Sequence, residues 1–144
     1  MQLYRPTGIK ELKLIAESGF RRFPPRLSEQ PIFYPVLVFD YAAQIARDWN
    51  AAVAPFAGFV TAFELDDSYA QTFEVRTVGE SHTHLELWVP AEELDRFNDH
   101  ILDEIKVVAI FYGEGFDGEV DAATGLPVSV KVSTNEDPPN NCGL

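Results

Sequence analysis

The pattern of hydrophobic and polar positions is clearest between residues 81 and 94, S-H-T-H-L-E-L-W-V-P-A-E-E-L. Apolar Leu85, Leu87 and Val89 alternate with His82, His84, Glu86 and Trp88. Because side chains alternate between faces along a strand, this pattern predicts a strand over 82–89 with one core face and one polar, aromatic face. Pro90 then ends the strand and begins a helix, since proline suits the first helical turn.

Similar alternation, or a short continuous apolar run, predicts further strands over residues 2–5, 31–38, 59–65, 74–78 and 105–112. Apolar residues three and four positions apart predict helices over 8–18, 41–50 and 90–101. This mixed order of short strands and helices indicates an α+β fold. We expect a single compact domain with small mixed or antiparallel sheets and three helices.

Local signals predict where two of these helices begin and end. Thr7 is the expected N-cap of the first helix, and Gly19 its C-terminal stop. Asp40 is the expected N-cap of the second helix. The core stripe of that second helix is predicted to be Ala42, Ile45, Ala46 and Trp49.

The composition changes after Tyr112, where glycine, acidic residues and proline become frequent. We therefore expect one α+β domain over 1–113 and a C-terminal extension over 114–134. Within the extension, residues 126–132 are predicted to pair as an extra strand. Residues 135–144 are predicted to be a disordered tail, because they hold almost no apolar side chains.

Composition places the chain among globular proteins, with 144 residues of which 46% are hydrophobic. The single cysteine, Cys142, excludes an internal disulfide framework. No apolar run approaches membrane-spanning length, and the first residues lack the apolar region of a signal peptide. These features predict a cytoplasmic protein without a membrane partner.

Charge is distributed unevenly along the chain, whose net charge is −12. Residues 1–30 hold six lysines and arginines against three acids, whereas residues 31–144 hold five against twenty. The strongly acidic remainder makes nucleic acid an unlikely partner. The N-terminal cations, by contrast, suit a small anion such as a pyrophosphate. They are Arg5, Lys10, Lys13, Arg21, Arg22 and Arg26.

Three residue types point to a candidate nucleotide site. Arg5 is the last residue of the first strand, in L-Y-R-P, Tyr34 lies in I-F-Y-P, and Glu86 lies in L-E-L-W-V-P. An arginine binds phosphate or ribose oxygens, an aromatic ring stacks on nicotinamide, and a glutamate binds a ribose hydroxyl and stabilises an oxocarbenium-like centre. Together these groups suit cleavage of the nicotinamide–ribose bond of NAD.

Two other interpretations of the sequence remain open. His82 and His84, with a remote third ligand, would suit a metal-dependent enzyme. The alternation places Glu86 about 13 Å from His82, too far for all three groups on the strand to hold one small ion. The excess of acidic residues over 31–144 would instead suit a non-catalytic, immunity-like protein that covers a basic surface of its partner.

Several longer runs carry a resemblance to a known family. They are L-Y-R-P-T-G-I-K-E-L-K-L-I-A-E-S-G-F-R-R-F-P-P-R, P-I-F-Y-P-V-L, Y-A-A-Q-I-A-R-D-W-N and E-L-W-V-P-A-E-E-L-D-R-F-N-D-H-I. Over residues 2–112 the chain resembles small bacterial proteins labelled ADP-ribosylation/crystallin J1. Its layout is similar to an ADP-ribosyltransferase-type fold, in which a first strand bears an arginine or histidine and a later strand the catalytic glutamate.

The resemblance implies an ADP-ribosyltransferase that uses NAD as substrate and needs no metal. On that analogy Arg5 holds NAD, Tyr34 or Tyr41 flanks the nicotinamide, and Glu86 is catalytic. Arg21 and His84 complete the residues expected to contact NAD. Arginine-specific members carry a second acid two residues before the glutamate, where this chain has His84. The resemblance therefore leaves the acceptor of the ADP-ribose open.

Overall fold

The computed structural model describes residues 1–79 and 84–130. Its strands are β1 (Gln2–Gly8), β2 (Ile32–Phe33), β3 (Ala57–Glu64), β4 (Val75–Thr77), β5 (Leu85–Leu87), β6 (Val89–Pro90) and β7 (Lys106–Tyr112). Its α-helices are α1 (Ile9–Glu17), α2 (Phe39–Ile45), α3 (Asp67–Ala70) and α4 (Leu94–Asp99). The fold is therefore α+β, as the sequence predicts, with one more α-helix than expected.

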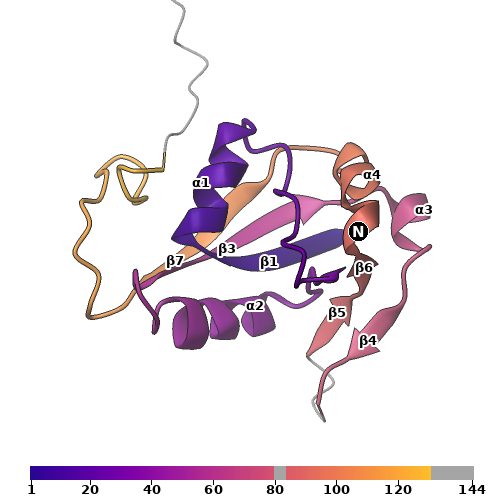
Figure 1. The fold of residues 1–144 in the computed structure, drawn as a ribbon, viewed down its shortest axis with the longest axis horizontal. Helices are drawn as coiled ribbons and strands as arrows, with labels where there is room; N and C mark the ends of the chain where they lie inside the picture. The colour runs from indigo at the N-terminus through magenta and orange to yellow at the C-terminus, as the bar shows by residue number, and fades with distance from the viewer. Residues whose placement is uncertain (80–83, 131–144) are drawn as a thin grey trace, which may run out of the picture.

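The central element is β3, which lies between β1 and β7 in an antiparallel sheet. All its residues from Ala57 to Phe63 are buried, because α1 covers one face of the sheet and α2 the other (Figure 1). This double burial explains why the strand is a continuous apolar run in the sequence. The predicted strands 2–5, 59–65 and 105–112 are confirmed.

A single residue, Val36, extends the pairing beyond β1. Its backbone N–H and C=O both bond to Tyr4, at 2.8 Å each, and Val36 also forms a bridge with Glu86. Glu86 belongs to β5, which pairs with β4, and further along the two segments β2 pairs with β6. Since paired residues share a face, Tyr4, Val36 and Glu86 all point to the α2 side of the sheet. Arg5 follows Tyr4 in β1 and points to the α1 side.

Helix α1 ends as predicted but begins differently. Gly19 has a φ of 76°, and the N–H groups of Gly19 and Phe20 donate to the carbonyls of Ala16 and Ile15. This Schellman pattern confirms the glycine stop. The prediction of Thr7 as N-cap is wrong, because Thr7 is a buried residue of β1 and the N-cap is Gly8, with no side-chain hydrogen bond.

Helix α2 continues into a π-helical turn, Ala46–Asn50, and this turn overturns one predicted core position. Ala42 and Ala46 are fully buried as predicted, but Trp49 is 72% exposed. A π-helical turn holds more residues than an α-turn, so it rotates Trp49 off the apolar stripe. The predicted N-cap Asp40 is also wrong, because the helix begins at Phe39 with Val38 as N-cap, and Asp40 lies in its first turn.

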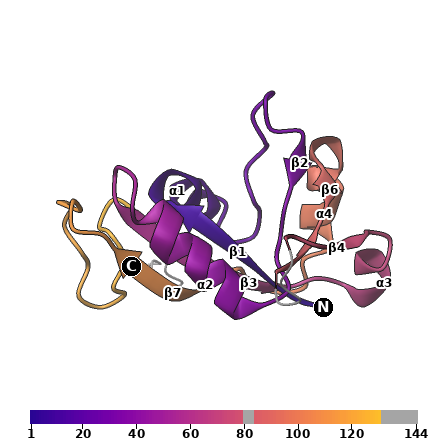
Figure 2. The same ribbon diagram turned by 90° about the horizontal axis from the view of Figure 1, so that it is seen from below.

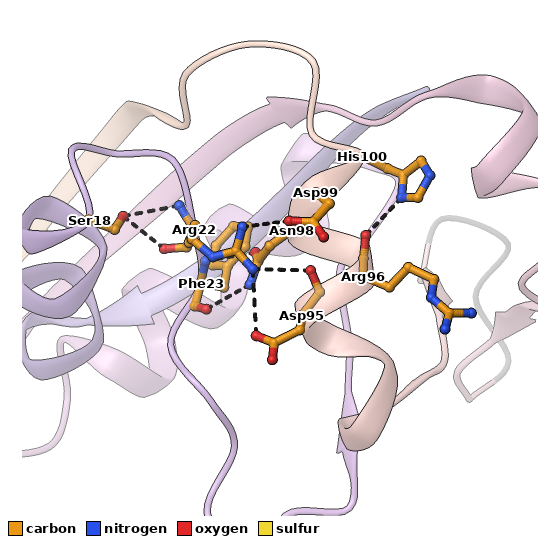
Figure 3. Close-up of polar contacts among 8 residues, drawn as sticks. All are labelled: Ser18, Arg22, Phe23, Asp95, Arg96, Asn98, Asp99 and His100. Carbon is orange, nitrogen blue, oxygen red and sulfur yellow. Dashed lines mark hydrogen bonds and ion pairs between the residues drawn. The ribbon is translucent and has the colours of Figure 1, made fainter.

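A second part of the core lies where α4 packs near the segment after α1 (Figures 1 and 2). Figure 3 shows the polar contacts that join them: the buried side chain of Asn98 accepts from the Phe23 N–H at 2.9 Å and donates to the Phe23 C=O at 3.0 Å. Arg22 pairs with Asp99 at 2.8 Å and with Asp95 at 3.5 Å. These bonds hold the start of the loop over 20–30 against α4.

The remaining predicted elements are partly confirmed. The helix over 90–101 is a 3₁₀ turn, Ala91–Glu93, followed by α4. The described part of the strand over 82–89 is β5 and β6. Of the extra strand over 126–132, only residues 126–130 are described, and there Pro127 forms an isolated antiparallel bridge with Val120. Leu126 and Val130 are buried against the α1 side. Residues 131–144, including the predicted disordered tail, lie outside the described residues.

Over the described ranges, no helix has the length and apolar character needed to cross a membrane.

Candidate functional site

A cleft of about 370 Å³ lies between the first turn of α1 and the loop that follows that helix. Its charged lining residues are Arg5, Lys10, Glu11 and Arg26. Its apolar walls come from Ile9, Leu14, Pro24, Pro25, Leu27 and Pro55. All of these residues except Pro55 belong to the N-terminal segment that carries the positive charge surplus.

Arg5 is held rigidly at one side of this cleft. Its Nε and one terminal nitrogen donate to the two carboxylate oxygens of Glu11, at 2.8 and 2.9 Å. Its guanidinium carbon lies 4.6 Å from the centre of the Phe33 ring. A bidentate ion pair on an aromatic face fixes the plane of the guanidinium.

Arg26 lies close to Arg5 but has no comparable partner. Its guanidinium carbon is 6.0 Å from the centre of the same Phe33 ring. Its Nε is buried and has no hydrogen-bond acceptor, and among the described residues no acid pairs with its guanidinium. Burial first, and then the positive charge of Arg5, lower the pKa of Arg26. A desolvated cation beside a like charge is an unfavourable arrangement that an anion would relieve.

The first turn of α1 adds further donors to the cleft. Gly8, Ile9 and Lys10 line it, and no side chain caps the helix at Gly8. The N–H groups of a first helical turn have no acceptor within the helix, and the helix dipole makes that end positive. The first turn of α1 therefore borders the same cleft as the guanidinium groups of Arg5 and Arg26.

The predicted catalytic residue, Glu86, lies in a separate cluster on the other face of the sheet. Its side chain is largely buried, with 9% of the residue exposed, and it accepts a hydrogen bond from Trp88 Nε1 at 2.9 Å. Burial raises the pKa of the Tyr41 hydroxyl, and the neighbouring charge of Glu86 adds to that rise. Burial raises the pKa of Glu86, and the hydrogen bond from Trp88 and the nearby Tyr41 hydroxyl partly oppose that rise.

Aromatic rings surround this glutamate. Tyr41 stacks on His84 with ring centres 4.3 Å apart, and Tyr34 meets Trp88 edge to face at 5.5 Å. The guanidinium of Arg76 lies 3.9 Å from the centre of the Trp88 ring. The described part of the polar face predicted for this strand therefore exists, with Tyr41 beside Glu86 and His84, and Tyr34 against Trp88.

The structure does not bring all the predicted site residues together. Arg5 lies on the α1 side of the sheet, whereas Glu86 lies on the α2 side, so the two do not line one cleft. Arg21 is exposed and is not among the lining residues of the cleft that Arg5 shares with Arg26. In the sequence, Arg26 stands out only as one of six cations within residues 1–30. The run P-P-R beside a surplus of cations was the one signal that could have identified it.

The metal interpretation can be examined only in part. His84 is described and stacks on Tyr41, whereas His82 lies outside the described residues. Within residues 1–79 and 84–130, no three histidine, cysteine, aspartate or glutamate side chains are grouped closely enough to hold a metal ion.

Comparison of the chain with models of protein families, with curated proteins and with solved structures finds no significant match in any of the three.

Proposed function

We propose that this protein binds a phosphate-bearing ligand of the nucleotide class in the cleft between α1 and the loop after it. One observation carries the proposal: the buried Nε of Arg26, which lies beside Arg5 and has no hydrogen-bond partner among the described residues. Leaving such a group without an acceptor is costly, and the gain from supplying one is correspondingly large. The chain as a whole is acidic, so this concentration of cations is a local feature.

The donors of the cleft match the oxygens of a phosphate or pyrophosphate. Arginine presents planar, bidentate donors to phosphate, and the free N–H groups at the start of α1 suit a second oxygen cluster. Glu11 neutralises only one of the three cations in the lining, Arg5, Lys10 and Arg26. The site therefore keeps a positive charge that favours an anion.

The apolar walls indicate that the ligand carries more than phosphate. Pro24, Pro25, Leu14 and Leu27 offer surfaces against which a ribose or base can pack. A volume of about 370 Å³ is near the lower end of the range for small-molecule sites. This volume suits the phosphate-bearing half of a dinucleotide, and NAD is the first ligand to test.

ADP-ribosyl transfer stays a prediction, and it has less support than binding. Glu86 is buried with a raised pKa, which is typical of functional carboxylates. However, it lies on the opposite face of the sheet from Arg5, so a ligand held by Arg5 and Arg26 does not meet it. The proposal therefore rests on the cleft alone and assigns no catalytic step.

Isothermal titration of NAD, ADP and pyrophosphate into the protein tests this proposal. Arg26→Gln is expected to weaken binding by roughly 10- to 100-fold, the factor that a charged hydrogen bond of about 1.5–3 kcal/mol supplies. Arg21→Gln is the matched control, because it removes the same charge from the same loop outside the cleft. It is expected to change affinity by less than about twofold.

Three results would contradict the proposal. They are the absence of binding by all three ligands at millimolar concentration, equal losses in the Arg21 and Arg26 variants, and loss of binding in Glu86→Gln with none in Arg26→Gln. The last result would indicate that the ligand binds on the face of the sheet that carries Glu86.

A further inference from the structure

A groove of about 750 Å³ lies on the opposite side of the sheet from the cleft that Arg5 and Arg26 line, beyond the point where α2 begins. Its floor is the row formed by Tyr4, Ala62 and Lys106 on adjacent strands. Helix α2 covers Val36 and Val60 but starts only at Phe39, so it leaves this end of the sheet without a helix.

Large apolar side chains stand exposed around the groove. Leu102 is 62% exposed and Val108 is 47% exposed, and the Phe39 ring borders them. A soluble domain normally keeps apolar side chains of this size scattered, so three around one hollow indicate a contact surface. The described residues contain nothing that packs over it.

Acidic groups dominate the rim of the same groove. Asp103 and Glu104 are exposed, and Glu64 is already paired with the N-terminal ammonium of Met1. Lys106 is the one cationic side chain in the lining. The two exposed carboxylates, which form no ion pair among the described residues, therefore outweigh a single lysine, and residues 31–144 as a whole are strongly acidic.

The neighbouring strand also offers backbone groups. β7 pairs with β3 on one side and ends the strand order of its sheet. No described strand or bridge pairs with its other side. Such an edge can receive an extended segment of another chain through backbone hydrogen bonds.

We propose that this groove docks an extended segment of a basic partner protein, with an apolar side chain seated between Phe39, Leu102 and Val108 and flanking lysines or arginines facing Asp103 and Glu104. The negative charge of the rim favours a basic segment over the other molecules that could occupy the groove. A nucleic acid or an anionic membrane would be repelled by the rim. A second copy related by twofold symmetry would bring Asp103 and Glu104 against their own counterparts.

Peptide titration followed by amide NMR shifts tests the proposal on the whole chain. The probes are a panel of seven-residue peptides with two lysines or arginines at each end and three varied apolar residues in the centre. One control set replaces the basic ends with glutamates, and a second replaces the apolar centre with glycine and serine. We expect members of the first panel alone to bind, with shifts at Leu102 to Val108 and at Phe39.

Matched variants separate a specific groove from general attraction. Val108→Thr is expected to weaken binding about tenfold. Val75→Thr makes the same change at a residue of similar exposure, 45%, on edge strand β4, and is expected to weaken it less than twofold. Glu104→Lys is expected to weaken binding more than Glu92→Lys, which reverses an equally exposed charge outside the groove.

Several outcomes would overturn this assignment. They are binding by no peptide of the panel, equal binding by the glutamate-flanked peptides, or equal losses in the Val75 and Val108 variants. Concentration-dependent shifts of the groove amides in the protein alone would assign the groove to a second copy instead.

Discussion

Arg5 and Arg26 share the ring of Phe33, with guanidinium carbons 4.6 and 6.0 Å from its centre, yet only Arg5 has an acidic partner. The Glu11 carboxylate accepts hydrogen bonds from Arg5. The positive charge of Arg5 in turn lowers the pKa of Arg26. The pair therefore holds one satisfied and one unsatisfied cation on a single aromatic face. This inequality distinguishes the cleft from an ordinary surface ion pair.

The first prediction concerns stability. Arg26→Gln removes a desolvated charge beside a like charge, so the variant is expected to unfold at the same or a higher temperature than the parent protein in buffer without phosphate. Sulfate or phosphate should raise the unfolding temperature of the parent protein, since a ligand of the native state stabilises it. Sulfate and phosphate should raise the unfolding temperature of the Arg26→Gln variant by a smaller amount.

Calorimetric scans of both proteins with and without phosphate, at constant ionic strength set by chloride, check this prediction. Arg21→Gln serves as the control and should respond to phosphate as the parent protein does. An identical phosphate response in all three proteins would show that the effect is not tied to Arg26.

A second prediction concerns Asn98. Replacing it with alanine removes two hydrogen bonds and leaves the buried N–H and C=O of Phe23 without side-chain partners. The expected loss is about 2–5 kcal/mol of unfolding free energy, because each unsatisfied buried group costs about 1–3 kcal/mol. Urea unfolding measures the loss. Asp95→Asn, an exposed change on the same helix, should cost less than about 0.5 kcal/mol.

The close approach of α2 to β3 gives a third prediction. A Cβ atom at Gly58 would collide with the backbone carbonyl of Ala46, where α2 passes into its π-helical turn. Gly58→Ala is therefore expected to destabilise the fold by roughly 1–3 kcal/mol or more, since a backbone atom cannot move aside easily. At Gly8 the nearest atom to an added Cβ is 3.9 Å away, so Gly8→Ala should be tolerated.

Thermal unfolding of the two glycine variants makes this comparison direct. Equal destabilisation by both would indicate that loss of glycine flexibility, rather than the contact with Ala46, controls stability. A mild effect at Gly58 would mean that α2 does not pack so closely against β3.

The fourth prediction concerns pH. Because burial raises the pKa of Glu86, the folded protein holds this proton more tightly than the unfolded chain does. The stabilisation from the protonated carboxyl is complete below the ordinary glutamate pKa of about 4.5, and it is lost as the pH rises through the raised value. The unfolding free energy of the parent protein should therefore fall relative to that of Glu86→Gln as the pH rises above 4.5.

Urea unfolding of both proteins between about pH 4 and pH 8 measures this difference. Glutamine still offers an oxygen to Trp88 and Tyr41, so the variant should keep the fold. A constant difference across that range would show that the protonation of Glu86 is not coupled to folding.

The sequence alone determined most of the strands and helices, because that information is local, although the short helix α3 was not expected. Short apolar runs identified β3 and β7, apolar spacing of three and four identified α1, and Gly19 marked the end of that helix correctly. Charge counting also located the cations of the future cleft within residues 1–30. Each of these inferences depends on neighbours a few positions apart.

Only the tertiary structure decided which side chains meet. Tyr4, Val36 and Glu86 lie in register across three segments, and a shift of one residue in that pairing would move Arg5 to the face of Glu86. No local pattern specifies this register. The π-helical turn that exposes Trp49, and the approach of Arg26 to Arg5 over Phe33, likewise depend on how distant segments pack. The sequence therefore determined the elements and their charges, and long-range packing decided that the cations form a cleft separate from the glutamate.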